Sequence, residues 1–210
     1  MKVLEKVERR LGEKLFLKGD RCRGPKCAAV RRGTPPGMHG SKTKRGRRRG
    51  GSSEYGALLA EKQKVRFVYG LDDRDLERYS KKAVSFGGIY SANLVILLET
   101  RLDNVVFQLG FADSRRMARF LVSHGHIMVG NRRVSIPSYH VRKGEIISIK
   151  PGSLARQLFS GIEAKLSRAM PPKWLSLDGS KKSGTVLGMP QLDDFVFTTD
   201  VAKIKEFYSR

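Results

Sequence analysis

Apolar residues recur at helical spacing in several separate segments of the chain. Ser52 and Ser53 precede the first of them and can cap a helix that begins near Glu54 and closes at Gly70. A second helix is predicted over 72–84, because the acids of the stretch LDDRDLER, residues 71–78, suit its positive end. The pattern over 92–110 predicts a third, longer helix, capped by Ser91 or Asn93 and ended by Gly110. Its apolar face consists of Leu98, Leu102, Val105, Val106 and Leu109.

The stretch DSRRMARFLVSHGHIMVGNRRV, residues 113–134, predicts a short amphipathic helix and a hairpin. At about 100° per residue, Met117, Phe120 and Leu121 fall on one apolar arc. Gly125 can adopt the left-handed conformation that ends a helix, and Gly130-Asn131 suits a tight hairpin turn. The arc opposite the apolar one carries Arg115, Arg116, Arg119 and Ser123.

The second half of the chain predicts short strands, then a helix and a tail. Val134 and Ile136 alternate with polar neighbours, and residues 145–150 follow a Lys-Gly turn, so both segments are typical of strands. A helix over 154–170 leads into a Pro-Pro break and a polar loop. We expect the tail to pack on the preceding domain.

These elements indicate an α+β fold with a helical N-terminal subdomain and a short, mainly antiparallel sheet. The predicted division is 1–53, a basic arm and loop; 54–92, a helical subdomain; 93–155, a helix-loop-strand module; and 156–210, a C-terminal helix and tail packed on the other domains.

Charge changes the picture most. The chain has 42 Lys and Arg against 20 Asp and Glu, a formal charge of +22. A polyanionic partner follows, and nucleic acid is the leading candidate. An anionic membrane surface would also match the charge, but the apolar run Leu94–Leu98 is far too short to span a bilayer. Because residues 1–19 carry no uninterrupted apolar signal, we expect a cytoplasmic protein without membrane contact.

Two groups of basic residues are candidates for nucleic-acid contact. An arm without acidic residues, 28–53, is rich in Gly, Pro and Arg and can be ordered by neutralisation on phosphates. A solvated flexible loop is the simpler alternative. The arm candidates are Lys42, Lys44, Arg45, Arg47, Arg48 and Arg49. The second group is a docking face around the 113–134 turn: Arg115, Arg116, Arg119, His124, His126, Arg132 and Arg133.

The sequence ADSRRMARFLVSHGHIMVGNRRVSIPSYHVRKGE, residues 112–145, resembles the RNA-binding module named after ribosomal protein four of the small subunit. That module also occurs in pseudouridine synthases and tyrosyl-tRNA synthetases. Further segments, among them KLFLKGDRC, PPGMHG, SSEYG, EKQKVRFVYG, RLDNVVFQLGFA, WLSLD and EFYSR, resemble the bacterial ribosomal protein family itself, in order along nearly the whole chain.

This resemblance implies a structural constituent of the small ribosomal subunit that binds 16S rRNA early and nucleates assembly of the subunit body. It also implies contact with ribosomal protein five, a place near the mRNA entrance for the arm, an influence on translational accuracy, and no homo-oligomer. The residues matching the arm's mRNA-unwinding positions are Arg47 to Arg49.

Many members of the family bind zinc through four cysteines, and here the chain departs from them. Cys22 and Cys27 keep one pair, whereas Glu5 and Glu8 align with the other. Two carboxylates in place of two thiolates weaken a structural zinc site. Cys22 and Cys27 are therefore weak metal candidates, and we expect a metal-free, packed thiol pair and no cofactor.

We find no motif of a catalytic site. The four histidines lie outside any HExxH pattern, and no GxxxxGK[ST] or GxSxG occurs. The alternative function is an RNA-modifying enzyme of the pseudouridine synthase type, because RLDN at 101–104 has the arginine-leucine-aspartate order of that class. We expect instead that Leu102 is core and that Asp103 is a salt-bridge partner on the exposed side of the helix.

Overall fold

The computed structural model describes residues 4–38, 40, 53–194 and 199–209. The chain forms two compact units, 1–80 with 198–210 and 81–197. Their boundaries differ from those of the four predicted segments, because the C-terminal residues join the N-terminal ones in unit 1. The arm candidates among residues 42–49 lie outside the described residues.

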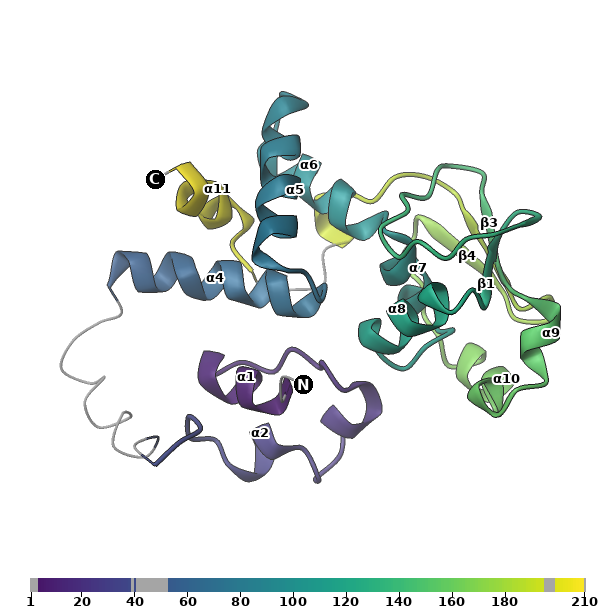
Figure 1. Ribbon diagram of the computed structural model, residues 1–210, viewed down its shortest axis with the longest axis horizontal. Coiled ribbons are helices and arrows are strands. Elements are labelled where there is room, and N and C mark those ends of the chain that lie inside the picture. Colours follow the sequence, from purple (N-terminus) through teal and green to yellow (C-terminus); the bar gives the residue numbers. More distant parts are fainter. Residues whose placement is uncertain (1–3, 39, 41–52, 195–198, 210) are drawn as a thin grey trace. The chain divides into compact units, whose positions relative to one another are not determined.

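Unit 1 is helical (Figure 1). Its elements are α1 (Leu4–Leu11), the 3₁₀ turn η1 (Gly19–Cys22), α2 (Ala28–Arg31), α4 (Glu54–Val68), most of α5 (Asp73–Ser85) and α11 (Val201–Ser209). As predicted, Ser53 caps α4, its side chain accepting a hydrogen bond from the Gly56 N–H at 3.1 Å.

The tail forms a helix that packs on α4, with the rings of Tyr55 and Phe207 5.7 Å apart. Lys62 of α4 also lies 4.6 Å from the Phe207 ring centroid. The tail therefore packs on a helix of the predicted 54–92 subdomain. Local periodicity could not reveal this, because the contact joins residues far apart in the chain.

Unit 2 contains an antiparallel sheet of order β2-β1-β3-β5-β4. The strands are β1 (Ile127–Val129), β2 (Arg132–Arg133), β3 (Ile146–Ile149), β4 (Leu175–Asp178) and β5 (Ser183–Val186). The helices are α6 (Tyr90–Glu99), α7 (Leu102–Gln108), α8 (Arg115–Ser123), α9 (Pro151–Leu154) and α10 (Ile162–Leu166), with 3₁₀ turns η2 (Gln157–Phe159) and η3 (Leu192–Asp194). The helices of both units together with this antiparallel sheet confirm the predicted α+β class.

The core of unit 2 lies between the sheet and helices α7, α8 and α10 (Figure 1). It contains Val105, Leu121, Ile147 and Trp174, all nearly inaccessible to solvent. Gly184 of β5 belongs to this packing, because a Cβ there would lie 2.3 Å from Cδ2 of Leu109, the residue that directly follows α7. A residue with a side chain would push the strand off the helix.

The long helix predicted over 92–110 is wrong, because the structure breaks it into α6 and α7. Arg101 is extended, with φ −64° and ψ 137°, and pairs with His140 in a β-bridge. The Leu102 N–H donates to Tyr139 O at 2.8 Å, and Val141 N–H donates to Thr100 O at 2.9 Å. These bonds compete with the helical ones, and Ile89 stands at the N-cap of α6 in place of Ser91 or Asn93.

Two later predictions also need correction. The segment 154–170 is not one helix: Gly161 adopts a left-handed conformation, φ 71°, which separates η2 from α10. The supposed polar loop after the Pro-Pro break contains the hairpin β4–β5, in which Leu175 pairs with Val186 and both are buried. The strand predicted over 145–150 agrees with β3. The strand predicted around Val134 and Ile136 is wrong, because β2 ends at Arg133.

Candidate nucleic-acid interface

Helix α8 and the hairpin β1–β2 carry the second group of predicted RNA-binding residues. Ser114 caps α8 by accepting a hydrogen bond from Met117 N–H at 3.2 Å, and Gly125, φ 69°, ends the turn after it. The face of α8 that enters the core carries Ala118, Leu121 and Val122. Phe120 is 43% exposed. The prediction that Phe120 belongs to the apolar arc is therefore wrong, because the helix is rotated about its axis relative to that arc.

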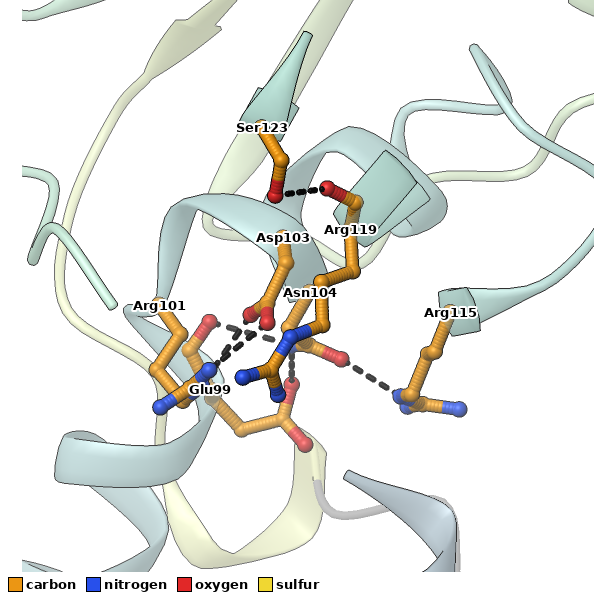
Figure 2. A network of polar contacts seen from close by, with 7 residues as sticks. All are labelled: Glu99, Arg101, Asp103, Asn104, Arg115, Arg119 and Ser123. Carbon is orange, nitrogen blue, oxygen red and sulfur yellow. Dashed lines mark hydrogen bonds and ion pairs between the residues drawn. The ribbon is translucent and has the colours of Figure 1, made fainter. Parts of the chain in front are cut away.

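The three arginines of α8 differ in their surroundings. Arg116 is exposed, and we find no acidic or hydrogen-bond partner for its side chain among the described residues. Arg115 is half-buried: its Nε donates to Asn104 Oδ1 at 2.7 Å, and its guanidinium lies 4.6 Å from the Phe107 ring centroid. Arg119 is half-buried as well, and Figure 2 shows its side chain extending toward Glu99 and Asn104.

Arg115 and Arg119 lie beside a buried polar network (Figure 2). Glu99 is fully buried and accepts from the side-chain amides of Asn104, at 2.7 Å, and Gln108. Asn104 therefore donates to Glu99 while it accepts from Arg115, so a single amide links the buried carboxylate to a cation of the surface. This arrangement restricts the orientation of the Arg115 guanidinium.

Asp103 belongs to the same region and corrects a prediction. It is 4% exposed and forms a two-pronged ion pair with Arg101, at 3.0 and 2.6 Å. Because the helix breaks at Arg101, Asp103 turns inward and not to the exposed side. A carboxylate buried against its own arginine supports the interpretation of RLDN as structure and offers no accessible nucleophile. Leu102 is fully buried, as predicted.

The two histidines of the turn have different environments. His124 is exposed, and its ring centroid lies 4.1 Å from that of Phe120. His126 is only 5% exposed and its Nδ1 lies 2.9 Å from Ser153 Oγ. Burial lowers the pKa of His126, and the nearby charges of Arg156, His124, Lys150 and Arg133 lower it further. The His126 ring is therefore buried against Ser153 and against Phe159 of η2.

The hairpin places Arg132 and Arg133 in the solvent, where we find no partner for either side chain within the described part of the chain. Arg133 folds back over the turn: a Cβ on Gly125 would lie 2.2 Å from its Nε. Lys150 and Arg156 also belong to this neighbourhood, because the Lys150 N–H donates to His126 O at 2.8 Å and the Arg156 N–H donates to Ser153 O at 3.0 Å. The sequence contained no signal for these two, because the strand β3 and the α9 turn carry them there.

The N-terminal cysteines lie with Glu8 in a buried cluster of unit 1, their ligand atoms within 4.8 Å of one another. Burial raises the pKa of the Cys22 thiol; the Lys18 N–H opposes this, whereas Glu8 and Cys27 add to it. One Glu8 oxygen accepts from the N–H groups of Leu15 and Leu17, both at 3.1 Å, and the other lies buried without a hydrogen-bond partner in the described residues.

Among the described residues, this cluster offers three possible metal ligands. A structural zinc ion takes four ligands. Glu5, aligned with the fourth ligand, is instead paired with Arg21 at 2.9 Å and Lys18 at 3.6 Å. The hydrogen bonds of Glu8 and the ion pairs of Glu5 connect α1 to residues 15–21.

In the part of the chain that the structure describes, no helix is both long and apolar enough to cross a bilayer. The apolar segments of unit 2 are instead accounted for by its core.

Comparison with known proteins covers nearly the whole chain. The family model described as S4 domain matches residues 100–147, and the model described as ribosomal protein S4/S9 N-terminal domain matches residues 4–99. The first match includes α7, α8, the hairpin β1–β2 and the first two residues of β3.

Three curated relatives match this chain with nearly the same sequence identity. Small ribosomal subunit protein uS4 of Syntrophomonas wolfei is 46% identical over 202 residues, 96% of this chain and 94% of that protein. The protein of the same name from Desulfitobacterium hafniense is 48% identical, with the same coverage of both chains. That of Thermus thermophilus is 46% identical over 203 residues, again 96% of this chain and 94% of the other. On this similarity the chain belongs to the uS4 family of small ribosomal subunit proteins.

Proposed function

We propose that this protein is a structural constituent of the small ribosomal subunit, in the cytoplasm, and that it binds 16S rRNA through the docking face of unit 2. The observation that carries the proposal is the match to the uS4 family over 96% of the chain. The exposed side chains of Arg116, Arg132 and Arg133 support it physically. Their guanidinium groups have no acidic partner among the described residues and are available to phosphate oxygens.

The contribution of each candidate follows from its burial. Arg116, Arg132 and Arg133 are exposed and can reach a phosphate directly. Arg115 is held by Asn104, so it offers RNA a guanidinium in a restricted orientation. His126 is buried, so it does not contact RNA and contributes by stabilising the turn between α8 and β1.

The finer partners remain proposals from the family resemblance. We propose that the arm of residues 42–49 contacts rRNA and mRNA near its entrance to the subunit, and that the protein contacts ribosomal protein five and nucleates assembly. No enzymatic role is proposed. The pseudouridine synthase alternative gains no support from the three relatives described above, which are named as small ribosomal subunit proteins.

The proposal is tested by footprinting the protein on 16S rRNA with chemical probes of the backbone. We expect protection at one multi-helix junction, at protein concentrations that leave unrelated RNA of equal length unprotected. Protection spread evenly along the rRNA would reduce the protein to a non-specific polycation and contradict the proposal. The double variant Arg116→Gln, Arg133→Gln should lose the protections next to unit 2, whereas the exposed Lys181→Gln on the β4–β5 turn is the matched control.

A further inference from the structure

Phe120 is a large apolar side chain that the fold leaves on the surface of the docking face. Its neighbours Ala118, Leu121 and Val122 are buried, whereas Phe120 is 43% exposed. The rings of Phe120 and His124 have centroids 4.1 Å apart and planes inclined at 42°. Residues 116, 120 and 124 are four apart on one helical strip, so the exposed Arg116 adjoins the pair.

Positive charge surrounds this aromatic pair. His126 lies next to His124, with ring centroids 6.4 Å apart. Arg133, Lys150 and Arg156 lie near His126, and their charges lower its pKa. Arg133 lies over Gly125, the residue directly after His124. The aromatic surface is therefore bordered by cations on the helix and on the hairpin.

Single exposed apolar residues are ordinary and need no ligand to explain them. Phe120 differs because it is paired with a second ring and placed among cations for which the described residues offer no acidic partner. A ligand that satisfies both features has a flat π face and an adjacent negative charge. An unstacked nucleotide has both, whereas a base inside a helix has its faces covered and a phospholipid headgroup has no flat π face.

We propose that Arg116, Phe120, His124 and Arg133 form a stacking platform for one unpaired base of the rRNA. The base lies on the ring pair, and its flanking phosphates contact Arg116 and Arg133. This inference rests on the proposed rRNA binding and adds to it a recognition of RNA structure: the platform favours a junction with a free base over a continuous helix, which offers only phosphates.

The test separates stacking from charge. Affinity for a 16S rRNA fragment is measured over a series of salt concentrations for Phe120→Leu, Phe120→Trp and Arg116→Gln. We expect Phe120→Leu to weaken binding about 5- to 100-fold at unchanged salt slope, because base–aromatic stacking involves no counterion. Phe120→Trp should retain affinity, and Arg116→Gln should reduce the slope by about one. Circular dichroism and melting temperature verify that each variant is folded.

Ultraviolet crosslinking of the unaltered protein gives a second measurement that no variant can confound. We expect a zero-length crosslink between Phe120 or His124 and an unpaired nucleotide, identified by mass spectrometry. If Phe120→Leu binds as the unaltered protein does while Arg116→Gln weakens binding, the platform is refuted and the proposed function stands. If the unaltered protein shows no preference for 16S rRNA, the proposed function fails first.

Discussion

Asp103 and Arg101 form an ion pair almost wholly removed from solvent, whereas Asp113 and Lys165 form one on the surface at 2.9 Å. The chain thus contains two ion pairs of an aspartate with a basic residue, one buried and one exposed. Removing one partner of a buried pair leaves an uncompensated charge and costs about 3–5 kcal/mol, but an exposed pair contributes about 0–1 kcal/mol.

We therefore expect Asp103→Ala to lower the free energy of unfolding by several times as much as Asp113→Ala. Urea unfolding followed by circular dichroism measures both. Equal losses would mean that Asp103 is not enclosed as described. A fold that survives Asp103→Ala while an RNA-modifying activity disappears would restore the enzymatic alternative.

His126 makes stability depend on pH, and His140 acts in the same direction, because burial lowers the pKa of each below its ordinary 6.5. Between its folded and unfolded pKa the unfolded chain binds more protons, so stability rises with pH. Stability is then lost as pH falls through about 6.5. The neutral side chains that contact His126 are Ser153 and Phe159. The charged groups around it are Arg133, Lys150, Arg156 and His124.

We expect the melting temperature to drop between about pH 7.5 and about pH 5.5, and His126→Gln to reduce that drop. The exposed His124→Gln is the control and should keep most of the drop, because burial is the first cause of the low pKa of His126 and the charge of His124 is a lesser one. Differential scanning calorimetry at both pH values decides the matter. A drop of the same size in all three proteins would remove His126 from the account.

The turn from α8 into β1 is the element on which the docking face depends. Gly125 and Gly130 both have positive φ, 69° and 56°, but only at Gly125 would a Cβ meet a neighbour, Arg133. Gly130 has open space around the position of its Cβ. The two glycines therefore distinguish backbone strain from displacement of a side chain.

We expect Gly130→Ala to cost about 1 kcal/mol of stability from the left-handed backbone alone and to leave rRNA affinity nearly unchanged. Gly125→Ala carries the same strain and also displaces Arg133, so it should weaken rRNA binding several-fold in addition. Filter binding beside thermal melting measures both effects. Identical rRNA affinity in the two variants would show that the position of Arg133 does not matter.

The connection between α1 and residues 15–21 is the corresponding feature of unit 1. We expect the purified, untagged protein to contain much less than one zinc per chain and to melt at the same temperature with a chelator. Glu8→Ala should destabilise it by about 1–3 kcal/mol or more, because it leaves two buried N–H groups unpaired. The exposed Asp20→Ala is the control. Stoichiometric zinc in elemental analysis would overturn this expectation.

Element types were predictable where local signals act alone. The Ser53 cap, the left-handed Gly125 and the Gly130 hairpin all follow from residue chemistry within a few positions. The break at Arg101 was not predictable, because the competing hydrogen bonds come from residues 139–141. The same holds for Phe120 and Arg115, whose exposure is set by how α8 sits on the core.

At the scale of the whole molecule, charge and family agree. A net charge of +22 requires a polyanion, and membership of the uS4 family identifies which kind. The sequence predicted the α+β class and the partner, but not the burial of His126 or the packing of α11 on α4. Those depend on contacts between distant segments, which periodicity does not encode.

The most direct test of the central claim is the affinity of the full chain for 16S rRNA as a function of salt. We predict tight binding that falls by about 10³ to 10⁵ between about 50 and about 200 mM salt, as expected for 6 to 10 phosphate contacts. We also predict that 16S rRNA remains preferred over unrelated RNA at every salt concentration. Equal affinity for both RNAs throughout the series would contradict the account.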